Sequence, residues 1–168
     1  MKVWILALAC AAWGASAAAD EFPPAPAPAD LSQGVTADDL AAVVSDAGGV
    51  VERVKEKDDN SFEVETVFPG DWSPWIDALH CTGDGDARRC TEYSIGVEIR
   101  AKSAVQARVL ARKLQFQYLS TAVDGALIIF TRLDTVSGGV SRAHIAAELR
   151  DIVTIMREQV APVVWRKQ

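Results

Sequence analysis

Three segments of the chain place their apolar residues on one helical face, which predicts three amphipathic helices. They span residues 37–47, 104–114 and 142–160. Residues that favour helix N-termini precede them: Thr36, Ser103 and Ser141. Asp39 lies three residues after Thr36 in a box-like arrangement, so it should help to cap the first helix.

Other segments alternate apolar and polar residues, a pattern typical of half-buried strands. The expected strands are residues 50–55, 62–68, 90–100, 116–120 and 126–134. Asp124-Gly125 predicts a hairpin between the last two, and Trp72 and Trp75 are expected in a loop, residues 70–77. The order α-β-β-β-α-β-β-α predicts an α+β fold, with an antiparallel sheet of about five strands and helices packed on it.

The N-terminus has the pattern of a secretory signal peptide. Lys2, an apolar run at residues 3–13 and small residues up to Ala19 predict a signal peptide over residues 1–19. An alternative is a lipoprotein signal that would lipidate Cys10. No other segment is long and apolar enough to cross a membrane, so we expect a periplasmic or secreted protein without stable membrane insertion.

The rest of the chain reads as a spacer followed by one domain. Residues 20–34 are rich in proline and alanine, which predicts an extended spacer, and residues 35–168 suit a single α+β domain. The 168-residue chain has a formal charge of −6, and removal of Lys2 with the signal peptide makes it −7. Nucleic acid is not expected as a partner, because such an acidic chain lacks a basic stripe.

Two cysteines remain after the signal peptide, Cys81 and Cys90. In an exported protein such a pair is interpreted first as a disulfide. A metal site or a redox centre is the alternative. His80 adjoins Cys81 too closely to share an ion with it easily, and redox pairs usually have C-x-x-C spacing. The sequence therefore favours a disulfide that ties two neighbouring strands, with His80 as an ordinary side chain on one of them. It predicts neither a metal site nor a cofactor.

Residues 124–134 (DGALIIFTRLD), followed by GGVS at 138–141 and an amphipathic helix, resemble the YbjN domain family. These bacterial proteins are described as candidate regulators of sensory transduction, and their fold resembles that of type III secretion chaperones. The resemblance covers about 130 residues from Gly34 onward. The family's usual Trp-Asn signature is missing, and residues 112–116 (RKLQF) stand roughly at that place. The resemblance implies an exported variant with a chaperone-like or regulatory function, and it carries over no catalytic residue.

No pattern of residues predicts an enzyme. The chain has two histidines and no nucleophile, zinc or phosphate-loop motif. Glu63, Glu65 and Glu98 could face one another across the sheet as a carboxylate pair, but at strand spacing they are more often solvent-facing.

The leading hypothesis is therefore a non-enzymatic module that binds an unidentified envelope protein. Trp72 and Trp75 are the candidate partner-binding residues, because tryptophan is enriched at binding hot spots. The alternative role for both is to cap the core of the sheet.

Two other hypotheses remain open. One is a small-molecule sensor with a pocket lined by Phe116, Tyr118, Phe130 and Met156. The other, compatible with either function, is a homodimer formed through the last helix. Apolar side chains near its end would provide the contact: Val160, Val163, Val164 and Trp165.

Overall fold

The structure is a computed structural model that describes residues 31, 33–57, 59–136 and 139–165. In chain order the elements are α1 (Ala37–Asp46), β1 (Val50–Glu56), β2 (Phe62–Val67), β3 (Trp75–Thr82), η1 (Gly85–Ala87), β4 (Arg89–Arg100), α2 (Ala104–Lys113), β5 (Ser120–Asp124), β6 (Leu127–Thr135), α3 (Arg142–Ile155), η2 (Met156–Val160) and α4 (Ala161–Val164). The predicted signal peptide with Cys10, and most of the predicted spacer, lie outside the described residues.

The strands form one antiparallel sheet in the order β1-β2-β3-β4-β6-β5. This confirms the predicted α+β class, but the described sheet has six strands rather than about five. The additional strand is β3, which begins at Trp75, a residue that the sequence pattern placed in a loop. The sequence indicated a strand around His80 that the disulfide joins to its neighbour, and this is confirmed, but it gave that strand no start. Ile76 on the inner side is buried and Trp75 on the outer side is also apolar, so alternation did not mark the first residues of β3.

The predicted strand at residues 116–120 is also corrected. Phe116 and Leu119 form an isolated bridge that closes a short turn, and β5 begins only at Ser120. Tyr118 in this turn is 68% exposed. The predicted hairpin is present, with Asp124 paired to Leu127 and Gly125 at a φ of 56°.

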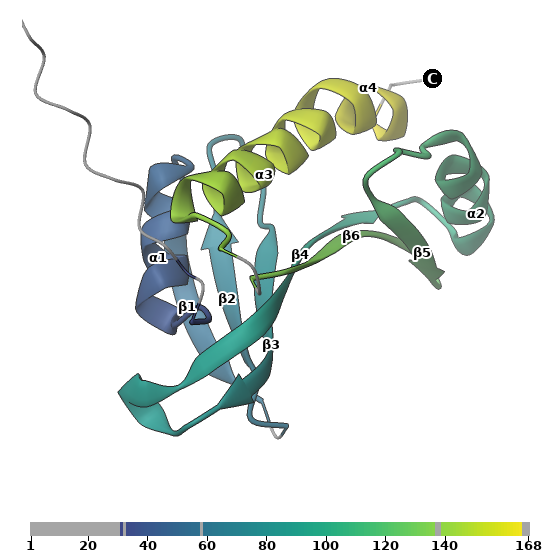
Figure 1. The fold of residues 1–168 in the computed structure, drawn as a ribbon. Helices are drawn as coiled ribbons and strands as arrows, with labels where there is room; N and C mark the ends of the chain where they lie inside the picture. The colour runs from purple at the N-terminus through teal and green to yellow at the C-terminus, as the bar shows by residue number, and fades with distance from the viewer. Residues whose placement is uncertain (1–30, 32, 58, 137–138, 166–168) are drawn as a thin grey trace, which may run out of the picture.

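The helices all pack on one face of the sheet. α1 and α3 lie over the half of the sheet that contains β1 to β4, and α2 lies against β5 and β6 at the other end (Figure 1). The residues of the sheet that face them are buried: Phe62, Val64, Ile76, Ala78, Tyr93, Ile95, Val97, Ile99, Ile128 and Phe130. The alternating positions point to the opposite face, which no described helix covers.

The helix starts agree with the sequence. The Thr36 hydroxyl accepts a hydrogen bond from the Asp39 N–H, and the Asp39 carboxylate accepts one from the Thr36 N–H. Ser103 and Ser141 each accept a hydrogen bond from the backbone N–H three residues later.

The long last helix is not α-helical to its end. The π-helical turn η2 follows α3, and Pro162 lies in the first turn of α4. Proline has no N–H and its ring crowds the carbonyl four residues earlier, so a wider turn before Pro162 accommodates it.

The described fold begins before the predicted domain boundary at residue 35. Leu31 is 5% exposed, and its N–H donates to the Val140 carbonyl at 3.2 Å. Val35 pairs with Cys90 through two backbone hydrogen bonds of 2.9 and 3.0 Å. The end of the proline-rich segment is therefore part of the core rather than a spacer.

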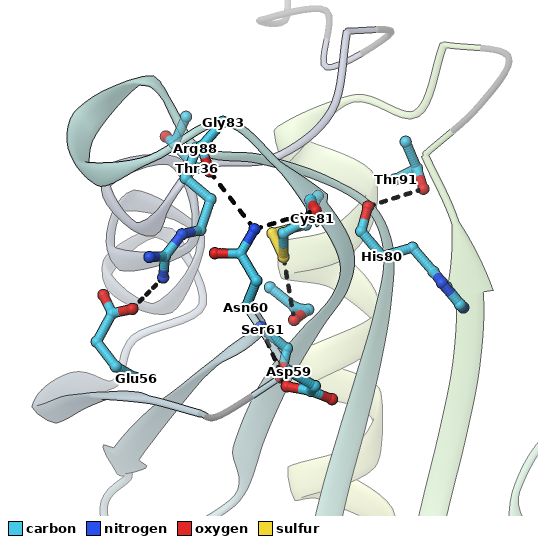
Figure 2. The surroundings of a disulfide bond; sticks show 12 residues. Thr36, Glu56, Asp59, Asn60, Ser61, His80, Cys81, Gly83, Arg88 and Thr91 are labelled. Atoms are coloured by element: carbon cyan, nitrogen blue, oxygen red, sulfur yellow. Dashed lines mark hydrogen bonds and ion pairs between the residues drawn. A yellow bond between two sulfur atoms is a disulfide. The ribbon is translucent and has the colours of Figure 1, made fainter.

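Cys81 and Cys90 form a disulfide that joins β3 to β4. Figure 2 shows Asn60, from the turn between β1 and β2, beside the disulfide. The Asn60 amide donates to the Cys81 carbonyl at 3.3 Å, and Arg88 forms an ion pair with Glu56. The disulfide thus lies where two hairpins and the chain segment before α1 meet.

His80, next to the disulfide, has an unusual backbone conformation. Its φ is +52°, although it lies within β3, and its side chain is 71% exposed. At a positive φ the β-carbon crowds the backbone, so this conformation strains a histidine but not a glycine.

Replacement of both cysteines, Cys81→Ala with Cys90→Ala, should lower the free energy of unfolding by about 2–3 kcal/mol. Without the cross-link the unfolded chain has more conformational entropy, which stabilises the unfolded state. Chemical denaturation measures this change. Treatment of the unmodified protein with a reductant should produce a similar loss, and the same treatment should leave the variant unaffected. Equal stability of variant and parent would contradict the expectation.

The substitution His80→Gly should raise the free energy of unfolding by about 0.5–1 kcal/mol, because glycine adopts this φ without strain. Denaturant unfolding of the oxidised protein measures it. Thr82→Gly is the matched control, since Thr82 is exposed in the same strand and has no positive φ, and it should be destabilising. A loss of stability in both variants would show that His80 is unstrained.

Candidate functional site

The open face of the sheet carries charged side chains from three adjacent strands. Glu63 and Glu65 of β2, Asp77 of β3 and Glu98 of β4 alternate with buried residues and therefore share this face. Trp75 lies among them, at the start of β3 and opposite both Glu65 and Gly96.

Trp75 is held in a fixed position on this face. Its indole lies against Gly96, where an added Cβ would come within 2.3 Å of two ring atoms. Its Nε1–H donates to the Asp77 carboxylate at 3.0 Å. Only glycine at position 96 leaves room for the indole to lie flat against the neighbouring strand.

A cleft of about 430 Å³ lies beside Trp75. Its lining comprises four carboxylates and four other residues: Glu52, Glu63, Glu65, Glu98, Thr66, Ser73, Pro74 and Trp75. The three glutamates that the sequence allowed to face one another across the sheet do line one cleft, although β3 lies between their strands. Glu52 was missed because it falls where the β1–β2 register shifts, between Val51 and Arg53, and strand alternation cannot assign its face.

Basic residues of β1, and Lys57 directly after it, pair with the acidic residues of β2 and β3. Arg53 lies 2.7 Å from Glu65, and Lys57 lies 3.1 Å from Glu63 and forms a further ion pair with Asp77. Lys55 contacts both Glu63 and Glu65. The cations approach from the edge of the sheet, and none of them lines the cleft.

These contacts favour the charged forms of Glu65 and Lys57. Hydrogen bonds from Lys55 and Arg53 hold the pKa of Glu65 below its ordinary value. Burial lowers the pKa of Lys57, but its hydrogen bonds to Asp77 and Glu63 outweigh this and the net pKa is raised. A carboxylate held ionised in this way offers a fixed negative charge rather than a proton.

The structure separates the two candidate tryptophans. Trp72 is 7% exposed and its ring stacks on that of Trp165 at a centroid distance of 5.3 Å. Trp72 therefore belongs to the core, whereas Trp75 is half-buried on the open face. Trp72 thus has the core role considered for the pair, and the partner-binding hypothesis is left with Trp75 alone.

A second polar cluster lies under α3, on the covered face. The Glu148 side chain is 6% exposed; it accepts a hydrogen bond from the Tyr93 hydroxyl at 2.6 Å and lies 2.5 Å from Arg132. Asp134, His144 and Glu148 offer ligand atoms close enough together for a metal ion. However, the Arg132 guanidinium contacts both Asp134 and Glu148, so a positive charge of the protein already lies where a metal ion would bind. We interpret the cluster as a buried ion pair that fixes α3 on the sheet; sequence spacing gave no sign of it.

The residues expected to line a small-molecule pocket are divided by the fold. Phe116 and Tyr118 line a cleft of about 270 Å³ beside α3, together with apolar residues of that helix. Phe130 and Met156 are fully buried in the core. Of the four apolar residues expected at a dimer contact, Val160 and Val164 are buried within the chain, while Val163 and Trp165 are 41% and 58% exposed.

The substitution Tyr93→Phe should lower the free energy of unfolding by about 1–3 kcal/mol, because it leaves an oxygen of buried Glu148 without its hydrogen bond. It should also change the pH dependence. Burial, and then the hydrogen bond to Glu148, raise the pKa of the Tyr93 hydroxyl far above its ordinary value. The unfolded chain ionises near pH 10 while the folded chain keeps the proton, so stability should fall above about pH 10, by up to about 1.4 kcal/mol per pH unit.

Denaturant unfolding of both proteins between pH 7 and 11 measures this difference, with Tyr118→Phe, an exposed tyrosine, as the control. The steeper loss above pH 10 should be present in the parent and in Tyr118→Phe, and absent from Tyr93→Phe. Parallel curves for all three proteins would contradict the assignment.

Comparison of the chain with protein-family models, with curated proteins and with solved structures finds no match. Among the described residues, no helix is long and apolar enough to cross a membrane. The functional conclusion for this chain is therefore carried by its own geometry: a one-sided sheet whose open face bears a rigid tryptophan and a cleft lined by glutamates.

Proposed function

We propose that the chain is an exported, non-enzymatic protein-binding module of the YbjN type, with a chaperone-like or regulatory role, and that it binds an envelope protein on the open face of its sheet. The observation that carries this proposal is the one-sided packing of the helices, which leaves an ordered tryptophan beside a cleft of about 430 Å³. A fixed aromatic residue loses little conformational freedom on binding, which favours its use as an anchor.

The disulfide supports the exported location. Such bonds persist in oxidising compartments and are rare in the reducing cytosol. The signal-peptide pattern of residues 1–19 points to the same compartment, and it makes the periplasm or the exterior the place where a partner would be met.

The face is a better binding surface than either edge of the sheet. The β1 edge carries a register shift and the charged residues Glu52, Arg53 and Lys55, features that protect edge strands from pairing with another chain. The β5 edge is only five residues long. Strand addition would therefore meet a distorted edge on one side and a short one on the other.

Binding also fits the chemistry of the cleft better than catalysis. Its lining contains no histidine and no cysteine, and cations outside it pair with Glu63 and hold the pKa of Glu65 below its ordinary value. A general acid or an activated nucleophile needs a proton donor or a base in position.

A small-molecule sensor is the second candidate. The cleft beside Phe116 and Tyr118 supports it, but its volume of about 270 Å³ falls just below the range of about 300–1,000 Å³ typical of ligand pockets. The cleft on the open face is larger, at about 430 Å³, and it lies beside a tryptophan that Gly96 and Asp77 hold in place. Protein binding is therefore the function that we propose.

The two tryptophans provide a matched test. Trp75→Ala should keep the fold, with a loss of at most about 2 kcal/mol, and should abolish partner capture, because it removes the anchor of the open face. Trp72→Ala should lower the free energy of unfolding by about 3–5 kcal/mol, because it opens a cavity in the core. Thermal unfolding measures stability, and in-cell photo-crosslinking followed by mass spectrometry measures capture.

The crosslinker would replace Ser73, which is exposed and lines the cleft, and in a control protein Asp151, which is exposed on α3. A partner captured from position 73, not from 151, and lost in Trp75→Ala is the expected result. Capture that persists in Trp75→Ala, or that is equal from both positions, would refute the proposed function.

A further inference from the structure

We infer that the partner presents an extended segment with a lysine or arginine flanked by apolar residues, and that the cationic head enters the cleft beside Trp75. This inference rests on the proposed function and names the chemistry of the partner. Three observations carry it: the charge of the cleft, the placement of the indole and the apolar surface next to them.

The cleft has an excess of negative charge. Four of its lining residues are glutamates and none is basic. Glu63 and Glu65 are paired with cations of β1 and with Lys57, whereas Glu52 and Glu98 form no ion pair with any residue that the structure describes. A cation in the cleft would therefore meet two uncompensated carboxylates, at a short distance where attraction is least screened by salt.

The indole of Trp75 adds an attraction that is selective for cations. Lysine and arginine bind the face of an aromatic ring within about 6 Å of its centre, and tryptophan is the best partner. Trp75 is already oriented by Gly96 and Asp77, so a cation that enters the cleft does not have to order the ring.

The surface beside the cleft favours a peptide over a free amine. Val50 and Val67 are paired across β1 and β2 and are 69% and 37% exposed. Val67 follows Thr66 and Glu65, which both line the cleft. Apolar residues next to the cation of the partner would therefore have apolar surface to cover.

The same charges disfavour other macromolecules. Nucleic acids and anionic lipid surfaces attract basic proteins, and both would be repelled by this face of a chain with a formal charge of −6. A basic segment of another protein is the partner that the face complements.

The inference is tested with three peptides of identical length and sequence, Val-X-Val within a glycine-serine frame, in which X is lysine, norleucine or glutamate. Isothermal titration or fluorescence of the mature protein measures the affinities. The lysine peptide should bind about tenfold more tightly than the norleucine peptide, the glutamate peptide should bind most weakly, and added salt should weaken only the lysine peptide.

Charge-neutral variants locate the contact. Glu52→Gln with Glu98→Gln should weaken the lysine peptide about fivefold to tenfold and leave the norleucine peptide unchanged, without loss of stability, because both residues are exposed and unpaired among the described residues. Glu158→Gln, the same change on η2, is the matched control and should have no effect. Trp75→Leu should weaken binding of the lysine peptide while keeping an apolar side chain on Gly96.

Equal binding of the lysine and norleucine peptides, or no binding of the lysine peptide at millimolar concentration, would overturn the inference. Equal affinity for free butylamine would also overturn it, because the site would then recognise an amine rather than a peptide. These results leave the proposed function intact if in-cell capture still depends on Trp75. Loss of that dependence overturns the proposed function instead.

Discussion

The four central strands of this sheet have one side that must be covered, and the three helical segments have enough apolar surface to cover only that side. The period of two along each strand gathers residues such as Val64, Ile95 and Phe130 on one face, where α1, α2 and α3 bury them. The other face keeps its charged side chains in water. The exposed site on this molecule follows from that division, because the same alternation that fills the core also arranges the glutamates in a row.

The open face is kept in shape by contacts that are individually weak. Exposed ion pairs such as that between Arg53 and Glu65 contribute little stability each, and they are more important for what they orient. The contact between Trp75 and Gly96 is different, because the indole fits only where residue 96 has no β-carbon. An ordered aromatic residue among fixed charges gives the face a defined surface.

The covered face has one polar exception. Glu148 is 5% exposed in an apolar surrounding, and Tyr93, Arg132 and His144 lie around its carboxylate. A buried carboxylate is tolerated only with such partners, and its partners come from β4, β6 and α3. The cluster therefore fixes the position of α3 over the sheet, although an apolar replacement of equal shape could be as stable.

The sequence by itself determined the local features of this protein. The caps at Thr36, Ser103 and Ser141, the hairpin at Gly125 and the paired cysteines follow from short-range chemistry that needs no neighbours. The α+β class followed from the order of the periodic segments. Only the tertiary structure decided that Trp75 begins a strand, that Trp72 stacks on a residue near the end of the chain, and that Glu52 joins the cleft. These outcomes depend on strand register, on a bulge and on contacts between distant residues, and no local pattern encodes them.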